Sequence, residues 1–216
     1  MLEDAQELST EATKQRVKEG KGSPVTNRGW QSYLYNFRLR DKEAGFWEGK
    51  FILDVGSGDK EDDPSFYFPG AKICAIDPEF GPDGRVGWNT AHEKRIGVVR
   101  EIPYDDDEFD LVLSSHSVPQ HIFPAEMPRA ISEMLRVMKP GGEIRLMPCV
   151  KGHGDISPEV ERALVNSGFE IEFIKDDMGA VTIIKTNEKL SDSSDLKREG
   201  WRNFHKAFFS KEETRE

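Results

Sequence analysis

Apolar residues after position 50 come in short runs, separated by segments rich in glycine, proline and charged residues. Short runs without clean alternation are typical of strands that are covered on both faces, as in a parallel sheet. The runs lie at residues 51–55, 72–77, 95–99, 109–115, 142–148, 169–175 and 180–186. The pattern predicts an α/β fold with a mostly parallel, seven-stranded sheet and helices on both of its faces.

Two helices are predicted in the second half of the chain. The first spans residues 124–139 and should end at Pro140-Gly141-Gly142, which predicts a stop and a turn. One face of this helix carries Ile131, Met134, Leu135 and Met138. The second spans residues 157–169, with Ser157 as N-cap and Pro158 at the first helical position. Only residues 176–179 separate the last two apolar runs, so these runs should form an antiparallel pair.

The first two connections between predicted strands lack the pattern of the full helix that usually joins parallel strands. Residues 57–71 are too short and too interrupted by proline for a full crossover helix, and residues 78–94 are rich in glycine, proline and asparagine. We therefore expect only a thin helical covering over the first part of the sheet.

The two ends of the chain differ from its middle. Residues 1–48 lack strand pattern and are predicted to be a partly helical segment, either capping a binding site or packed on the side of the domain. Residues 49–187 are expected to form the main domain. Residues 188–216 form a tail with one amphipathic helix, which should dock on the domain or on a second subunit of a homodimer. The apolar positions of that helix are Leu196, Trp201, Phe204 and Phe208.

Composition narrows the class of protein. The net charge is −10, and the short basic stretches are mixed with acids, which argues against nucleic acid as a partner. No apolar run approaches the roughly 18 residues that span a membrane, and the first residues lack the apolar core of a signal peptide. Cys74 and Cys149 are the two cysteines, so neither a disulfide framework nor a cysteine-rich metal site is expected. A cytoplasmic protein without a bound metal is the simplest interpretation.

A glycine-rich turn follows the first predicted strand. The strand ends near Asp54, and Gly56 and Gly58 would let a ligand approach the backbone closely because neither carries a Cβ atom. The second predicted strand ends in Asp77, about twenty residues on, where a carboxylate can accept both hydroxyls of a ribose. A solvated carboxylate at a strand end is the alternative for Asp77. The combination indicates a nucleotide site.

Two longer stretches resemble a known family. The segment IPYDDDEFDLVLSSHSVPQHI (102–122) and the segment EMLRVMKPGGEIRL (133–146) are similar to class I S-adenosylmethionine-dependent methyltransferases. The resemblance covers about residues 50–150 and is greatest for the small-molecule branch, which includes enzymes of ubiquinone and menaquinone biosynthesis. It implies a Rossmann-like fold, S-adenosylmethionine as cofactor and a small-molecule or small carrier-linked acceptor.

The resemblance also implies a function for particular residues. The methionine part of the cofactor would be held by Asp54, Gly56, Ser57 and Gly58. Asp77 would bind the ribose hydroxyls, with Pro78 beside the adenine. Ser114 and Ser115 would line the pocket near the sulfonium.

Two positions depart from the family pattern. Lys60 stands where the first motif usually has a third glycine, and Val98 stands where many relatives have an acidic residue that contacts the adenine amino group. A nicotinamide-type fingerprint fails as well, because Glu61 follows where its third glycine is expected. An NAD-dependent oxidoreductase therefore fits less well than a methyltransferase.

Histidines are the candidate bases for an acceptor that must lose a proton. His116 follows Ser115 directly and is the first candidate. His121 is another, although a packing or capping function is an alternative there, and His153 lies in the loop after the fifth predicted strand, where acceptors often bind in the family. No Asn/Asp/Ser-Pro-Pro-aromatic tetrapeptide follows the fourth predicted strand, which argues against the methyltransferases of exocyclic amines. A methyltransferase-like domain with little catalysis, acting as a sensor or an assembly partner, remains the rival hypothesis.

Overall fold

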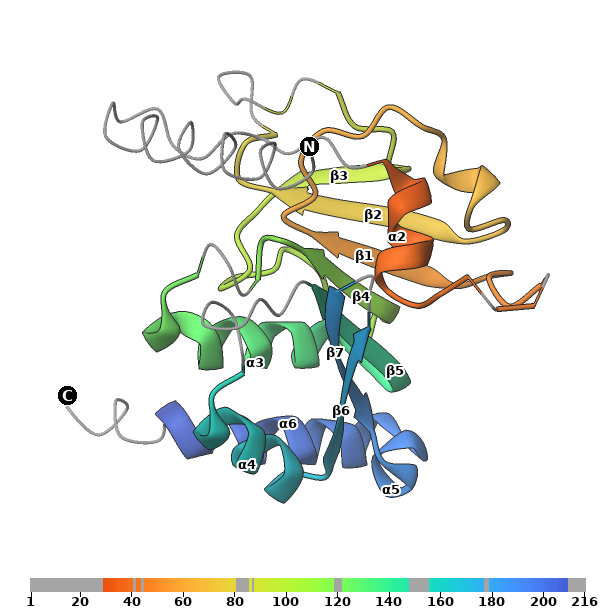
Figure 1. Cartoon of the computed structure of the whole chain (residues 1–216). Helices are drawn as coiled ribbons and strands as arrows, with labels where there is room; N and C mark the ends of the chain where they lie inside the picture. The colour runs from red at the N-terminus through yellow and green to blue at the C-terminus, as the bar shows by residue number, and fades with distance from the viewer. Residues whose placement is uncertain are drawn as a thin grey trace, which may run out of the picture.

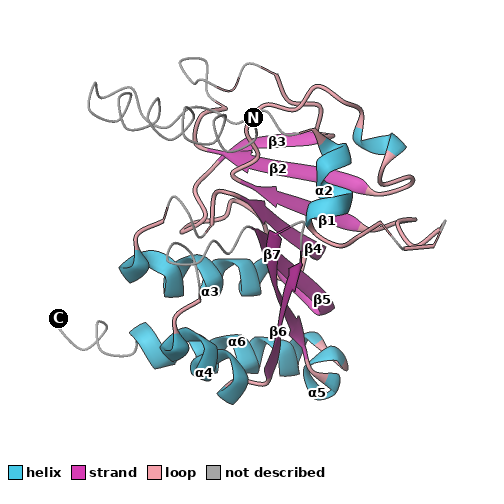
Figure 2. Ribbon diagram, viewed as in Figure 1, coloured by secondary structure: helices cyan, strands magenta, loops and turns pink. Residues whose placement is uncertain are grey.

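The computed structural model describes residues 29–40, 42–43, 45–80, 86, 88–118, 122–147, 156–176 and 179–209. These residues form one seven-stranded sheet with helices on both faces (Figures 1 and 2). The strands are β1 (Phe51–Val55), β2 (Lys72–Asp77), β3 (Glu93–Ile96), β4 (Phe109–Ser115), β5 (Met138–Met147), β6 (Phe169–Asp176) and β7 (Gly179–Thr186).

The strand order is β3-β2-β1-β4-β5-β7-β6. The first five strands pair in parallel, whereas β7 is antiparallel to both β5 and β6. The order reverses between β1 and β4, and the carboxyl ends of parallel strands at such a point are where ligands bind in open α/β sheets. The predicted sheet, including its antiparallel pair near the C-terminus, is confirmed.

Each face of the sheet has its own apolar core. Leu53 and Val55 of β1 point into one core, and Ile52 points into the other, as the alternation of a strand requires. Helices α3 (Met127–Val137), α4 (Pro158–Asn166) and α6 (Ser194–Phe209) cover the first face, while α2 (Trp30–Asn36) covers the second (Figure 2). Helices on both faces explain why the strands read as continuous apolar runs.

The predicted helices form for the expected local reasons. Helix α3 buries Met127, Ala130, Ile131, Met134 and Leu135, a spacing of three and four residues along one face. Helix α4 begins after Ser157, whose hydroxyl accepts a hydrogen bond from the N–H of Val160. The first crossover contains only the short 3₁₀ helix η1 (Pro64–Phe66), which confirms its predicted shortening. A second one, η2 (Pro124–Glu126), precedes α3.

The third predicted strand, residues 95–99, is misplaced along the chain. Strand β3 begins at Glu93 and ends at Ile96, because it pairs with β2 in the register Cys74 to Glu93. This is an edge strand, and Ile96 is 61% exposed. Of the apolar residues that suggested a strand, Ile96 is exposed and Val98 lines a cavity, while Val99 packs against the core from a position after the strand.

The structure also differs from the prediction of a turn directly after α3. Strand β5 begins at Met138, four residues earlier than expected, so Pro140-Gly141-Gly142 lies within it. The strand pairing shifts register between Phe109 and Leu111, which accommodates the proline and glycines as an irregularity. A Cβ atom on Gly142 would lie 2.9 Å from the backbone oxygen of Lys139, so the close approach requires glycine.

The C-terminal segment packs on the domain. The sequence left open whether it would dock there or on a second subunit. Helix α5 (Glu188–Ser191) precedes α6, which packs against α3. Lys197 of α6 is fully buried, and its ammonium lies 2.8 Å from Asp107 and 2.8 Å from the backbone oxygen of Arg136. Within the described part of the chain, no helix combines the length and the apolar character needed to cross a membrane.

Candidate functional site

The glycine-rich turn lies directly at the carboxyl end of β1. Gly56 and Gly58 have φ angles of 69° and 62°, in the left-handed region that favours glycine. A Cβ atom on Gly56 would lie 2.1 Å from the Oγ atom of Ser117, so a larger residue does not fit there. The turn is held to the neighbouring strand by the N–H of Gly56, which donates to the backbone oxygen of Ile76 at 2.9 Å.

Asp77 lies at the end of β2, beside this turn. Its carboxylate accepts hydrogen bonds from the N–H of Gly58 at 3.0 Å and from the N–H of Glu79 at 2.9 Å. Burial raises the pKa of Asp77, and the two backbone hydrogen bonds oppose that shift. Each carboxylate oxygen can accept more than one hydrogen bond, so Asp77 keeps capacity for a ligand hydroxyl.

A cavity of about 200 Å³ opens at the carboxyl ends of β1 and β2. Its walls are mainly apolar, and the residues nearest to the turn are Gly56, Pro78 and Ser117. Val98 also lines this cavity, together with Ile122 and the Arg100–Glu126 ion pair. Asp77 directly precedes Pro78, so a flat apolar group between these walls can carry a polar group that reaches past Pro78 to Asp77.

Lys60 fills the other side of the turn. Its side chain is 1% exposed, and its ammonium lies 2.7 Å from the Oδ2 atom of Asp54. The same ammonium donates to the hydroxyl of Ser57 at 3.0 Å and to the backbone oxygen of Ser57. The Ser57 hydroxyl in turn donates to Asp54 Oδ2 at 2.5 Å. The carboxylate at the end of β1 is therefore neutralised by a cation from the chain itself.

Helix α2 covers this buried ion pair. The hydroxyl of Tyr33 donates to Asp54 Oδ1 at 2.9 Å, and the rings of Trp30 and Tyr33 lie 4.8 and 4.7 Å from the Lys60 ammonium. Both distances are within the range of cation–π contacts. Of the two alternatives for the N-terminal segment, the described residues 30–36 support a cap over the site as well as packing on the sheet.

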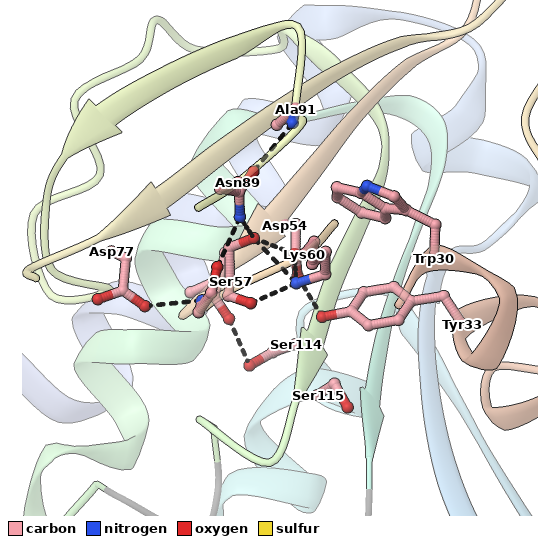
Figure 3. Close-up of polar contacts among 12 residues, drawn as sticks. Trp30, Tyr33, Asp54, Ser57, Lys60, Asp77, Asn89, Ala91, Ser114 and Ser115 are labelled. Carbon is pink, nitrogen blue, oxygen red and sulfur yellow. Dashed lines mark hydrogen bonds and ion pairs between the residues drawn. The ribbon is translucent and has the colours of Figure 1, made fainter. Parts of the chain in front are cut away.

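Asn89 clamps the turn from the second crossover. Its side-chain amide donates to the Ser57 hydroxyl at 2.9 Å and to the backbone oxygen of Gly58 at 2.6 Å. Figure 3 shows Asp77 on one side of Ser57, and Lys60, Tyr33 and Trp30 on the other. The turn thus separates an open apolar cavity from a closed polar cluster.

The end of β4 contributes three of the predicted residues. Ser114 is fully buried, and its hydroxyl donates to the backbone oxygen of Val55 and accepts from the N–H of Val118, both at 3.0 Å. In this geometry Ser114 holds β1 and the segment after β4 together. The Ser115 hydroxyl lies 3.0 Å from Nδ1 of His116, which is half-buried. His116 has a φ angle of 62°, an uncommon conformation for histidine that is often found near functional sites.

The structure gathers most of the predicted residues at one edge of the sheet. His121, His153 and Cys149 lie outside the described residues. Tyr33, Asn89 and Trp30 were not predicted, because each reaches the site from a segment without a recognisable motif. Lys60 carried a signal in the sequence, since it replaces an expected glycine, but its contact with Asp54 required the fold.

Comparisons with known proteins agree with the sequence resemblance. Residues 53–146 match a family model described as a methyltransferase domain. The chain is 33% identical to a demethylmenaquinone methyltransferase of Thermobifida fusca over 119 residues, which cover 52% of this chain and 48% of that protein. A demethylmenaquinone methyltransferase of Clavibacter sepedonicus is 31% identical over 100 residues, covering 44% of this chain and 40% of that protein. The chain thus spans at most about half the length of these two relatives.

A solved structure shares the fold. A TehB-like S-adenosylmethionine-dependent methyltransferase of Corynebacterium glutamicum superposes with a TM-score of 0.52 at 16% identity. The match covers 82% of this chain and 97% of that one. It extends the likeness beyond residues 53–146 to most of the fold.

Proposed function

We propose, on the premise that residues 53–146 belong to the class I S-adenosylmethionine-dependent methyltransferase family, that this chain transfers a methyl group to a small-molecule or small carrier-linked acceptor. S-adenosylmethionine, when bound, would supply a methyl group activated by its sulfonium: an acceptor lone pair would form the bond to the methyl carbon in line with the breaking S–CH3 bond, with S-adenosylhomocysteine as the leaving group. The chain's own residues would bind and align donor and acceptor, and alignment alone supplies much of the rate of such a reaction.

The residues of the open cavity fit the nucleoside half of this cofactor. We assign Asp77 to the ribose hydroxyls, and Pro78 and Val98 to the adenine. Gly56, Ser57 and Gly58 are assigned to the part of the ligand that crosses the turn, with Ser114 and Ser115 bracing its far side. The observation that carries the proposal is the buried Asp77 carboxylate, which accepts from the N–H of Gly58 and directly precedes Pro78 in the wall of the apolar cavity.

Equilibrium titration tests the cofactor directly. The full chain should bind S-adenosylhomocysteine and S-adenosylmethionine and should not bind NAD. Incubation with metabolite extracts and labelled S-adenosylmethionine should then transfer the label to a small molecule. Binding of NAD in preference to both methyl-donor nucleosides would overturn the proposal.

His116 is proposed as the base for an oxygen or nitrogen acceptor. In the tautomer in which Nδ1–H donates to the Ser115 hydroxyl, Nε2 carries the lone pair that can take a proton. His116→Ala should lower single-turnover methyl transfer by roughly 10²–10⁴-fold, and the wild-type rate should fall as the pH drops through about 6.5. His205→Ala is the matched control, since His205 lies on α6 and contacts Ser132. A His116→Ala variant that keeps most of its rate at every pH would remove this histidine from the mechanism.

A second candidate function is a domain that binds the cofactor with little catalysis, as a sensor or an assembly partner. The buried Lys60 favours it, because the polar half of the site is closed by the chain itself. The labelling experiment separates the two: nucleoside binding without transfer to any acceptor would support the sensor.

A further inference from the structure

The cluster around Lys60 has the composition of an occupied ligand subsite. A buried carboxylate, a serine hydroxyl, a backbone oxygen and two aromatic rings surround one ammonium. These groups are the ones that bind an organic ammonium in proteins. Here the ammonium belongs to the chain, six positions after Asp54.

We propose that Lys60 occupies the subsite for the ammonium of the methyl donor, so that the nucleoside half binds independently while the amino-acid half must displace Lys60. This inference rests on the proposed function. In Figure 3 the turn at Ser57 lies between Asp77 and Asp54, so a ligand held at Asp77 that crosses the glycine-rich turn reaches the Asp54 side next. The amino-acid half of S-adenosylhomocysteine carries an ammonium, and two cations cannot share the one Asp54 carboxylate without repulsion.

The displacement concerns the side chain of Lys60 rather than its backbone. Lys60 lies between β1 and η1, in a single β-bridge with Asn89, and its backbone N–H is bonded to the oxygen of Trp88. The backbone can keep these contacts while the ammonium leaves Asp54, and the side chain must then move out from beneath Trp30 and Tyr33. Lys60 would act as a specificity-determining residue that favours nucleosides lacking the amino-acid tail.

The test compares two ligands that differ by that tail. Calorimetric titration of the full chain with 5′-methylthioadenosine and S-adenosylhomocysteine gives the ratio of the two affinities. In the wild type the tail should add little, and the affinities should agree within about tenfold. In Lys60→Ala the affinity for S-adenosylhomocysteine should rise by about tenfold or more, the effect of one charge-assisted hydrogen bond, while that for 5′-methylthioadenosine stays unchanged.

Lys197→Ala is the matched control. Lys197 is also 1% exposed and also bonded to a buried aspartate, but it lies on α6, in contact with Asp107. This variant loses a buried ammonium in the same way and should keep the wild-type affinity ratio. An unchanged ratio in Lys60→Ala, or one that also rises in Lys197→Ala, would overturn the inference.

A second measurement needs no variant, in case Lys60→Ala does not fold. Reductive methylation followed by mass spectrometry should find Lys60 protected in the free chain and with 5′-methylthioadenosine, and labelled with saturating S-adenosylhomocysteine. Lys60 that stays protected with S-adenosylhomocysteine bound contradicts the displacement. If neither nucleoside binds any variant, the proposed function fails and the inference with it. If both bind with an unchanged ratio, only the inference is lost.

Discussion

Among the residues that the structure describes, two lysine–aspartate pairs have buried side chains, one at each end of the fold. Lys60 meets Asp54 at the glycine-rich turn, and Lys197 meets Asp107 beneath the C-terminal helix. The Asp54 pair joins residues close in sequence, whereas the Asp107 pair joins positions 90 residues apart. One pair therefore fills a site, and the other fixes α6 to the rest of the domain.

The surroundings of the two ammonium groups explain this difference. Aromatic rings of α2 face Lys60, and a ligand ammonium could take over every one of its contacts. Both ammonium groups also donate to a backbone oxygen, Lys60 to that of Ser57 and Lys197 to that of Arg136, but the contacts of Lys197 join α6 to the segments around β4 and α3. Burial lowers the pKa of Lys197 despite the hydrogen bond and charge of Asp107. Desolvation thus outweighs the pairing, and such a pair fixes the position of a helix more than it adds stability.

The largest effect is expected from breaking the pair beneath α6. Lys197→Ala leaves the Asp107 carboxylate buried beside Arg198 alone, and removing one partner of a buried pair costs about 3–5 kcal/mol of unfolding free energy. Urea denaturation measures this loss. Saturating S-adenosylhomocysteine should stabilise Lys197→Ala no more than it stabilises the wild type.

Lys60→Ala should behave in the opposite way. Its stability should also fall, but S-adenosylhomocysteine should restore more of it than 5′-methylthioadenosine does, because only the former brings an ammonium to Asp54. Equal rescue of the two lysine variants by S-adenosylhomocysteine would remove the distinction between the pairs.

Asp107→Asn combined with Lys197→Met removes both charges and should recover part of the unfolding free energy that Lys197→Ala loses, since asparagine tolerates the φ of 58° at position 107.

The sequence predicted the sheet more accurately than it predicted the site. The strand segments and helix faces follow from local patterns, such as the three- and four-residue spacing from Met127 to Leu135. The polar cluster does not, because Tyr33, Lys60 and Asn89 come from three segments that only the fold brings together. Strand β3 was misplaced for a related reason: Val98 is apolar because it lines a cavity, not because it lies in a strand.

An intermediate effect is expected at Asp77, which is buried at the same edge of the sheet as Asp54. Asp77→Ala should weaken 5′-methylthioadenosine binding by about 1.5–3 kcal/mol, the range for hydrogen bonds to a charged group. Isothermal titration measures this loss, with the Lys197→Ala variant as a control for general destabilisation. If binding is unchanged while the melting temperature falls sharply, Asp77 is a structural carboxylate that only holds Gly58 and Glu79.

The raised pKa of Asp77 adds a pH dependence with a definite sign. On acidification the folded chain takes up this proton at a higher pH than an unfolded aspartate does, so nucleoside affinity should begin to fall above the ordinary aspartate range. The free energy of unfolding should change with pH in the opposite direction. Between the ordinary aspartate pKa of the unfolded chain and the raised pKa of Asp77 in the folded chain, the folded state binds more protons, so the contribution of Asp77 to stability declines as the pH rises. Affinity in Asp77→Ala should lose this dependence.

The smallest effect should come from the exposed partner of the C-terminal pair. Arg198 lies 2.8 Å from Asp107, but its side chain is 38% exposed, so water and salt screen the interaction. Arg198→Gln should therefore cost only about 0.2–1 kcal/mol of unfolding free energy, and less at high salt. Comparing its urea denaturation with that of Lys197→Ala measures how much of the neutralisation of Asp107 depends on the buried lysine. If Arg198→Gln loses as much unfolding free energy as Lys197→Ala, both cations hold the Asp107 carboxylate equally. Burial of the cation would then not explain the difference between the Asp107 pair and the Asp54 pair.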